Sequence, residues 1–458
     1  MKWRPRIGAL VVACGVLGLA AAMAAAEGFR GYLAVSAGQM VAEENADHLF
    51  VPASVQKLLV AAAALDALGE EHVLRTVVRA RGEVSNGQLE GDLVVEAGGD
   101  PTWSRTFRPD DPEAPLAELA ASIADRGVER VTGDLVIDVS AFPGRRFHPD
   151  RPLVELGVAL GAPTAAIALH DNVFEIVIRP GLRPGEPAHA TSVEPIAIDN
   201  RMVSVGKARH GKGSVEFFPS WGRDEVVVRG EYPVSEGSYR VRVAVPSPES
   251  WVGGKLLDHL RAAGVEIAGE VVVQYAASSA DGPVLAEVAT PLVDLFEPIL
   301  SDSTNWLAAM LLQAVALEVT GQGRLDDGIE TVATFLTDDV GVDDSSFSLR
   351  DASGLSPTNL VSPRTVVAVL SYAMSSKWGP TLLGNLAAPG SGTLAGWPVL
   401  PVVAAKTGTI RNSLALAGVI EPGTADPVVF AIFLNHDTRP LARRRREVAA
   451  LVRSWVAP

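Results

Sequence analysis

Ser54 and Lys57 are the first side chains along this sequence whose types and spacing could perform chemistry together. On a helix, residues three positions apart leave the same face, and their Cβ atoms lie about 5–6 Å apart. A hydroxyl beside a neutral amine can act as a nucleophile with its base. A helix that begins near Ser54 would also direct backbone N–H groups and its positive dipole end toward a developing oxyanion.

Two motifs farther along the chain could complete this pair. Ser303-Thr304-Asn305 has the form S-x-N at a predicted helix start, and Lys406-Thr407-Gly408-Thr409 lies on a predicted strand. Taken singly, the first could be a helix cap and the second an edge strand. Together with S-x-x-K, in this order, they form a motif set known from class A β-lactamases and penicillin-binding proteins. The combination predicts catalysis through an acyl-enzyme.

Each catalytic side chain has a chemical reason for its type. Ser54 would attack the substrate carbonyl after Lys57 takes its proton, which requires burial or a neighbouring cation such as Lys406 to lower the pKa of Lys57. Ser303 would pass the proton to the leaving amine. Asn305 would hold the substrate amide and orient Lys57.

The K-T-G motif is the predicted substrate-binding strand. Lys406, Thr407 and Thr409 would bind a substrate carboxylate through charge and hydroxyl donors. Gly408 would let the acyl group approach the strand, since glycine has no side chain in the way. The backbone N–H groups of Ser54 and Thr409 would form the oxyanion hole.

The elements that position these residues follow from the hydrophobic pattern. Residues 58–65 are entirely apolar and predict a buried helix after Ser54. The pattern predicts further helices at 305–319, 325–336 and 363–374 and from about 443, and closing strands at 414–420 and 428–434. Between the helix after Ser54 and the helix at 305–319, residues 162–277 are mostly short strands with Gly and Pro turns. The fold class is therefore α+β, with a catalytic domain split by a long β-rich insertion.

The sequence resembles the low-molecular-mass class C penicillin-binding proteins, a family of D-alanyl-D-alanine carboxypeptidase/endopeptidases. Besides the three motifs, the resemblance rests on several further stretches: 51–58, 91–93, 98–102, 133–138, 161–163, 351–356, 361–364 and 392–394. It implies a penicilloyl-serine-transferase (β-lactamase/transpeptidase-like) domain interrupted by two nested smaller domains. It also implies peptidoglycan stem peptides as substrates and β-lactam antibiotics as covalent inhibitors.

The domain boundaries predicted from the resemblance and the pattern place a signal peptide at 1–26. The D,D-peptidase domain would comprise 27–74 and 284–458. A β-rich insert would comprise 75–97 and 163–283, and a small α/β insert would comprise 98–162. An acidic residue near the Gly-Ala-Pro of 161–163 meets the stem-peptide amine in some relatives, and Glu155 is the nearest match here; the alternative is a solvated carboxylate.

The N-terminal residues indicate where the protein acts, and the charge of the chain restricts its partners. Lys2, Arg4 and Arg6 precede an apolar run that ends in small residues near Ala26, which is typical of a signal peptide. We expect an exported, periplasmic or extracytoplasmic protein; an uncleaved segment would act as a membrane anchor. The net charge of −15 argues against nucleic acid as a partner. The arginine run 443–446 is interpreted as a solvated face, with weak contact to membrane or wall polymer as the alternative.

Three functional hypotheses remain open from the sequence. The first is a serine D,D-peptidase that requires no metal or organic cofactor; the eight histidines lack metal-ligand spacing. The second is a β-lactamase-like or D-amino-acid-amidase activity, which differs in how fast water removes the acyl group. The third is a catalytically weak peptidoglycan-binding protein, because catalysis tolerates errors of only about 1 Å.

Overall fold

The computed structural model describes residues 28–207, 214–220, 223–277 and 281–456. The predicted signal peptide, residues 1–26, lies outside these ranges. Among the described helices, none is long and apolar enough to cross a membrane.

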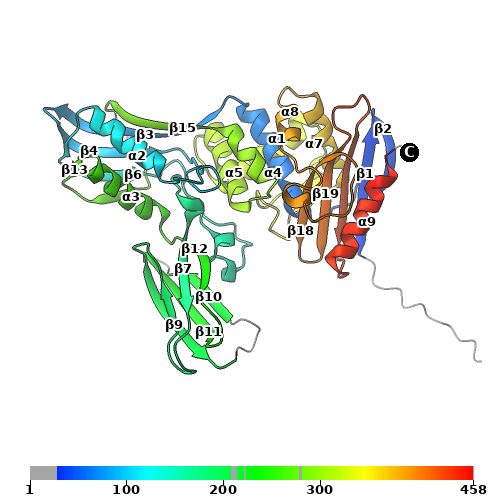
Figure 1. Ribbon diagram of the computed structural model, residues 1–458. Coiled ribbons are helices and arrows are strands. Elements are labelled where there is room, and N and C mark those ends of the chain that lie inside the picture. Colours follow the sequence, from blue (N-terminus) through cyan, green and yellow to red (C-terminus); the bar gives the residue numbers. More distant parts are fainter. Residues whose placement is uncertain (1–27, 208–213, 221–222, 278–280, 457–458) are drawn as a thin grey trace, which may run out of the picture.

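A five-stranded antiparallel sheet joins the two ends of the described chain (Figure 1). Its strand order is β18-β19-β20-β1-β2, so the N-terminal strands lie beside the C-terminal ones. The segment that carries Ser54 contacts β18, the strand that carries Lys406. The strands are β1 (Phe29–Ser36), β2 (Gln39–Glu44), β18 (Val403–Ile410), β19 (Ser413–Ile420) and β20 (Val428–Asn435).

The C-terminal helix α9 (Leu441–Ser454) covers one face of this sheet (Figure 1). Its apolar side, including Val448, is buried in a core shared with the sheet. Arg444 lies on that side and is only 8% exposed, whereas Arg443 and Arg446 are exposed. The interpretation of the arginine run as a solvated face is therefore wrong for Arg444, because its place in the helical period turns it toward the sheet.

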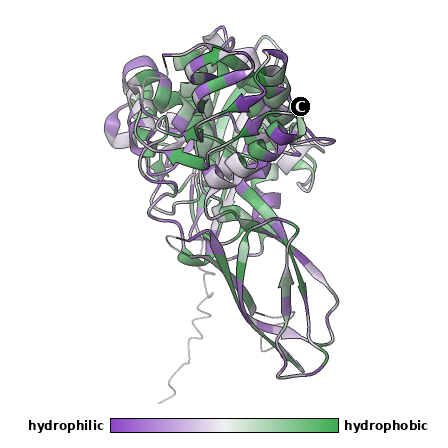
Figure 2. Cartoon of the chain, turned by 90° about the vertical axis from the view of Figure 1, so that its left-hand side faces the viewer, coloured by the Kyte–Doolittle hydropathy of each residue, from purple (hydrophilic) through white to green (hydrophobic). Residues whose placement is uncertain are grey.

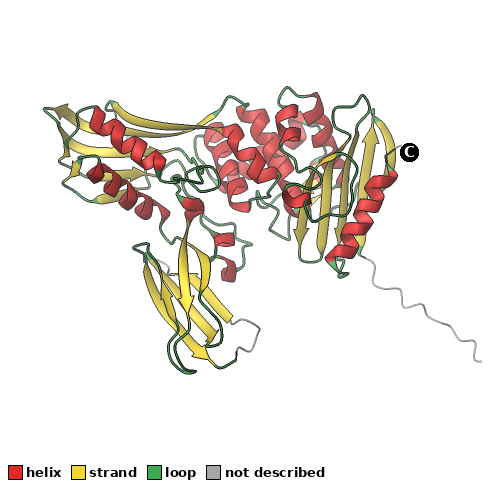
Figure 3. Ribbon diagram, in the orientation of Figure 1, coloured by secondary structure: helices red, strands yellow, loops and turns green. Residues whose placement is uncertain are grey.

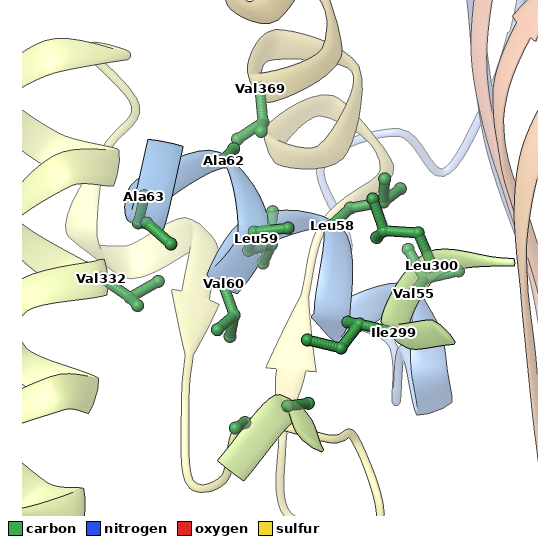
Figure 4. Close-up of a cluster of buried hydrophobic side chains, with 14 of the residues drawn as sticks. Val55, Leu58, Leu59, Val60, Ala62, Ala63, Ile299, Leu300, Val332 and Val369 are labelled. Atoms are coloured by element: carbon green, nitrogen blue, oxygen red, sulfur yellow. The ribbon is translucent and has the colours of Figure 1, made fainter. Parts of the chain in front are cut away.

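Helices cover the other face and separate this sheet from a second one (Figure 3). Residues 58–65 of the central helix are at most 1% exposed, as expected for a helix that is apolar all round. Figure 4 shows this helix packed against Ile299, Val332 and Val369 of three neighbouring helices. The helices are α1 (Gln56–Leu68), α4 (Phe296–Leu300), α5 (Asn305–Thr320), α6 (Leu325–Thr334), α7 (Pro363–Ser375) and α8 (Gly379–Gly384). Of these, α1, α5, α6 and α7 agree with predicted helices, whereas the short helices α4 and α8 were not predicted.

The second sheet has seven strands and is packed against two helices, α2 (Ala114–Asp125) and α3 (Pro248–Ala262) (Figure 1). Its main path is β13-β5-β4-β3-β15, and β6 pairs with both β4 and β14. The strands are β3 (Val73–Ser85), β4 (Gln88–Ala97), β5 (Arg130–Val131), β6 (Leu135–Asp138), β13 (Glu266–Ile267), β14 (Val271–Gln274) and β15 (Val284–Pro291).

Two three-stranded sheets, β10-β11-β9 and β12-β7-β8, form a lobe that projects from the rest of the molecule (Figures 1 and 2). The strands are β7 (Val173–Arg179), β8 (His189–Thr191), β9 (Ala197–Val205), β10 (Ser214–Pro219), β11 (Glu225–Pro233) and β12 (Tyr239–Ala244). A separate short pair, β16 (Phe347–Ser348) and β17 (Leu360–Val361), lies near the Ser54 segment, because Phe50 bridges to Val361.

The strand pairing corrects the predicted division of the insertion. Residues 75–97 and 98–162 were assigned to separate units, but β4 pairs in parallel with both β5 and β6. β6 in turn pairs with β14, from the segment assigned to the β-rich insert. The alternating pattern identifies strands and their buried faces but carries no information on which distant strand completes the sheet.

Candidate active site

Ser54 lies in a tight helical turn, Ala53–Val55, that leads directly into α1. Ala53 is fully buried and has a φ of +48°, a conformation that costs a non-glycine residue energy. The turn leaves Ser54 partly exposed, while Lys57 in the first turn of α1 is 0% exposed. The predicted pair therefore lies at a helix start, with the nucleophile accessible and the amine buried.

The Lys57 amine lies among three oxygen atoms. Its Nζ is 3.0 Å from Ser54 Oγ, 2.7 Å from Asn305 Oδ1 and 2.8 Å from the carbonyl oxygen of Ser353. The amide and carbonyl oxygens can only accept, so they take two N–H bonds of a neutral amine. The remaining lone pair is then free to accept the Ser54 hydroxyl proton.

The surroundings of Lys57 favour this neutral amine. Burial lowers the pKa of Lys57 well below its ordinary value, and the positive charge of Lys406 lowers it further. The carboxylate of Asp351 opposes these effects, and Arg151 adds a smaller lowering. A buried lysine that is neutral near physiological pH can serve as a general base.

The S-x-N motif reaches this site from the start of α5. Asn305 is the first residue of that helix, and its Oδ1 accepts the bond from Lys57. Ser303 has a φ of +68°, and this residue, with its hydroxyl, is partly exposed. That hydroxyl is therefore available to a substrate.

β18 brings the K-T-G motif to the nucleophile. A Cβ added to Gly408 would lie 3.1 Å from the Ser54 nitrogen and 2.6 Å from the Pro52 oxygen, so only glycine fits there. Lys406 is fully buried, and its Nζ donates to the Thr407 oxygen at 3.0 Å. Burial lowers the pKa of Lys406 to about 7, against an opposing effect of the Asp302 carboxylate.

The free edge of β18 points its backbone toward the Ser54 side. The Ala405 nitrogen donates to the Ala387 oxygen, away from β19, at 2.9 Å. Because successive residues of a strand alternate in direction, Thr407 and Thr409 direct their N–H groups to the same edge. Thr407 is 7% exposed, and Thr409 is exposed.

Glu155 lies beside these residues in a cleft of about 570 Å³. The cleft is also lined by Asp150, Arg151, Asp351 and Ile410, the last of which follows Thr409 directly. Glu155 is thus near the K-T-G strand, and it is also close enough to Arg151 for its charge to act on that guanidinium. Asp150 is a second carboxylate in the same cleft that sequence reasoning did not single out.

Sequence reasoning included residues 351–356 in the family resemblance but assigned no role to Ser353, which supplies the third oxygen around Lys57. Ser353 contributes only a backbone carbonyl, which has no side-chain signature in a sequence. The signal that could have indicated it is Gly354, which has a φ of +80° and would place a Cβ 1.8 Å from the Ala53 oxygen. In the described part of the chain, no group of three or more His, Cys, Asp or Glu side chains is arranged to hold a metal ion.

Comparisons with known proteins identify the family of this chain. A model of the D-Ala-D-Ala carboxypeptidase 3 (S13) family matches residues 26–454. The D-alanyl-D-alanine carboxypeptidase of Actinomadura sp. (strain R39) is 32% identical over 430 residues, covering 88% of this chain and 76% of that protein. DacB of Haemophilus influenzae, another D-alanyl-D-alanine carboxypeptidase, is 27% identical, covering 88% of this chain and 84% of that protein.

Solved structures match over the same length. The crystal structure of penicillin binding protein 4 (dacB) from Haemophilus influenzae aligns with a TM-score of 0.80 at 26% identity, covering 91% of this chain and 92% of that one. A second structure of that protein, in complex with a β-lactam, aligns with a TM-score of 0.76 at 25% identity, covering 93% and 94%. Since the family model spans nearly the whole sequence and a curated relative exceeds 30% identity, this chain belongs to the D-Ala-D-Ala carboxypeptidase 3 (S13) family.

Proposed function

We propose that Ser54 is the nucleophile with which this chain, a D-Ala-D-Ala carboxypeptidase by its family, removes the terminal D-Ala from peptidoglycan stem peptides. The observation that carries the proposal is the set of three oxygens around the buried Lys57 amine. Two of them only accept hydrogen bonds, so they orient the amine and leave its lone pair facing Ser54. This geometry supports Lys57 as the general base.

The reaction would proceed in two halves. Lys57 takes the Ser54 proton while Oγ attacks the carbonyl of the D-Ala–D-Ala bond. When the peptide bond breaks, Ser303 gives its proton to the departing amine of D-Ala and receives a proton in turn from Lys57, which is then neutral again. The acyl group then rests on Ser54 until water, activated by the same base, hydrolyses the ester. A β-lactam would acylate Ser54 by the first half of this sequence and leave slowly.

The substrate carboxylate would bind along β18. Lys406 supplies the positive charge, and the hydroxyls of Thr407 and Thr409 supply donors. The backbone N–H groups of Ser54 and Thr409 would hold the oxyanion; the close approach at Gly408 and the alternation along β18 support this assignment. Lys406 binds a carboxylate only while it is protonated, so binding should weaken as the pH rises through about 7.

The stem peptide would extend from Ser54 into the cleft that Glu155 lines. We assign Glu155 to the free amine of the stem peptide, as expected from the resemblance, with Asp150 as a second carboxylate for the same charge. Because the cleft is open, it also leaves room for a crosslinked peptide, which supports an additional D,D-endopeptidase activity.

The chain would act outside the cytoplasm, where the wall peptides lie, after export by the segment at residues 1–26. We further propose a transpeptidase-like domain made of residues 28–72 and 292–456. An α/β unit, residues 73–139 and 248–291, would be inserted in this domain. The β-rich lobe, residues 170–245, would in turn be inserted between the two segments of the α/β unit. The sheet pairings support these revised boundaries.

Labelled penicillin tests the assignment of Ser54. The purified chain should form a stable covalent adduct, and Ser54→Ala should form none, because Ser54 Oγ is the one hydroxyl bonded to the Lys57 amine in the part of the chain that the structure describes. Equal labelling of both proteins would refute the assignment. Release of D-Ala from a D-Ala-D-Ala peptide distinguishes the peptidase from a binding protein, and a fast loss of label would indicate β-lactamase-like turnover.

A further inference from the structure

A loop outside the three motifs touches the nucleophile turn at three points. We call residues 351–359 the Asp351 loop. Its Ser353 carbonyl accepts from Lys57 at 2.8 Å, and its Asp351 carbonyl accepts from Gln56 Nε2 at 3.2 Å. Gly354 packs so closely on Ala53 that an added Cβ would lie 1.8 Å from the Ala53 oxygen. The loop therefore contacts the residues on both sides of Ser54.

The carboxylate of Asp351 holds this loop together. Its Oδ1 accepts from the Gly354 nitrogen at 2.7 Å and from Asn359 Nδ2 at 2.8 Å. Its Oδ2 accepts from Ser353 Oγ and from the Ser356 nitrogen, both at 3.1 Å. Asp351 is 7% exposed, so the loop is built around a buried, fully bonded carboxylate.

Asn359 closes the loop from the other side. Its Oδ1 accepts from the backbone nitrogens of Arg350 at 2.7 Å and Asp351 at 3.2 Å. The following strand, β17, is tied to the Ser54 segment, because Phe50 and Val361 exchange two backbone hydrogen bonds of 3.0 and 2.9 Å. The position of the Ser353 carbonyl is therefore fixed relative to α1 by covalent and hydrogen-bonded links.

We propose that Asp351 is a positioning residue for catalysis: through this loop it places the Ser353 carbonyl that orients the Lys57 amine toward Ser54. The inference rests on the proposed function, since it requires Lys57 to be the base. Without the carbonyl in place, the amine would keep two oxygen partners, Ser54 and Asn305, and its lone pair would lose its fixed direction.

Asp351 also acts on Lys57 through its charge. The charged groups that face the Lys57 amine are Lys406 from β18, Arg151 from the segment before Glu155, and Asp351 itself. The two cations lower the pKa of Lys57 and Asp351 raises it. Removal of Asp351 and removal of Arg151 should therefore move this pKa in opposite directions, which a purely structural role would not do.

The test compares Asp351→Asn with Arg151→Gln, using kcat and KM for D-Ala release from a D-Ala-D-Ala peptide across a pH series. We expect kcat of Asp351→Asn to fall by about 100-fold, the effect of a misplacement near 1 Å, with KM changed much less. Its acidic limb, which reports protonation of the base, should move to lower pH. The acidic limb of Arg151→Gln should move to higher pH.

Two further variants exclude other causes. Thr358→Ala changes an exposed side chain of the same loop whose hydroxyl contacts Ser356 and Asp150 but not Asp351, so its kcat should stay within about twofold of wild type. His148 lies close enough to Asp351 to sense its charge. His148→Gln should keep the wild-type acidic limb if Lys57 is the group that titrates.

A folded Asp351→Asn protein with wild-type kcat and an unmoved acidic limb would overturn the proposal. If this variant does not fold, Asn359→Ala decides instead, because it loosens the loop and keeps the charge. A fall in kcat with an unmoved limb then supports the proposal, and unchanged kcat in the folded protein overturns it. The assignment of Ser54 as the nucleophile is tested separately, by the loss of penicillin labelling in Ser54→Ala. It would therefore stand even if the role proposed for Asp351 were refuted.

Discussion

The substitution Asn305→Asp tests whether Lys57 is the base by changing one charge and almost no shape. The aspartate keeps an oxygen where Asn305 Oδ1 now accepts from Lys57 Nζ at 2.7 Å. It replaces a neutral amide with a carboxylate, which favours the charged ammonium form of Lys57. A protonated Lys57 cannot take the Ser54 proton, so the acyl-transfer step should fail at a pH where the wild-type protein is active.

The size of the effect follows from the distance and the burial. An opposite charge within about 4–6 Å shifts a pKa by about 1–3 units, and Lys57 is 0% exposed, so water does not screen the pair. Each unit corresponds to about a tenfold change in the fraction of neutral amine. We therefore expect kcat/KM below the new pKa to fall by about 10- to 1,000-fold, and the acidic limb to move upward by about 1–3 pH units.

The assay is kcat/KM for D-Ala release across a pH series, with Asn305→Ala as the control. The alanine variant removes the acceptor but adds no charge, and a buried donor left unsatisfied costs about 1–3 kcal/mol, or about 5- to 150-fold. Its acidic limb should not move upward. If Asn305→Asp shows a loss of similar size and an acidic limb at the wild-type pH, Lys57 is not the base and the reasoning fails.

Three further predictions concern the same framework. Asp302→Asn should lower the pKa of Lys406 below about 7, since the Asp302 charge raises it, and so move the alkaline limb of kcat/KM to lower pH. Lys406→Met should flatten the pH dependence of stability. In wild type, between pH about 7 and 10.5, the Lys406 amine is protonated in the unfolded chain but not in the folded one, so the free energy of unfolding rises with pH in this range. Urea unfolding at pH 7 and 9 measures this rise in wild type and its loss in the variant. Leu311→Ala, at a fully buried position in α5, should lower the unfolding free energy by about 2–5 kcal/mol in the same assay.

The sequence predicted those parts of the site that depend on local structure. The spacing of Ser54 and Lys57 identifies one helix face, and the apolar run after Lys57 identifies a buried helix, as found. Asn305 was expected at a helix start and lies there. In each case the prediction depends on contacts within one helix turn or on the chemical type of the side chain, and both can be read from the sequence.

The parts that the sequence did not predict depend on contacts between distant segments. β4 pairs with β6, although the sequence had grouped β4 with the β-rich insert. This pairing depends on the register between whole strands, which the alternating pattern of a single strand does not specify. The bond from Lys57 to the Ser353 carbonyl joins residues that are 296 positions apart, and its acceptor is present in every residue.

Buried polar groups nevertheless restrict where such contacts can form. A buried amine must have hydrogen-bond partners, since each unsatisfied donor costs about 1–3 kcal/mol. Lys57, once identified as buried by the apolar residues around it, therefore requires acceptors besides Asn305. Gly354 then identifies where a backbone can come close enough, because its φ of +80° disfavours a side chain and an added Cβ would lie only 1.8 Å from the Ala53 oxygen. Gly354→Ala should accordingly displace the Ser353 carbonyl and reduce penicillin acylation of Ser54, whereas Gly341→Ala, which also has a positive φ but no neighbour within 4 Å, should leave acylation unchanged.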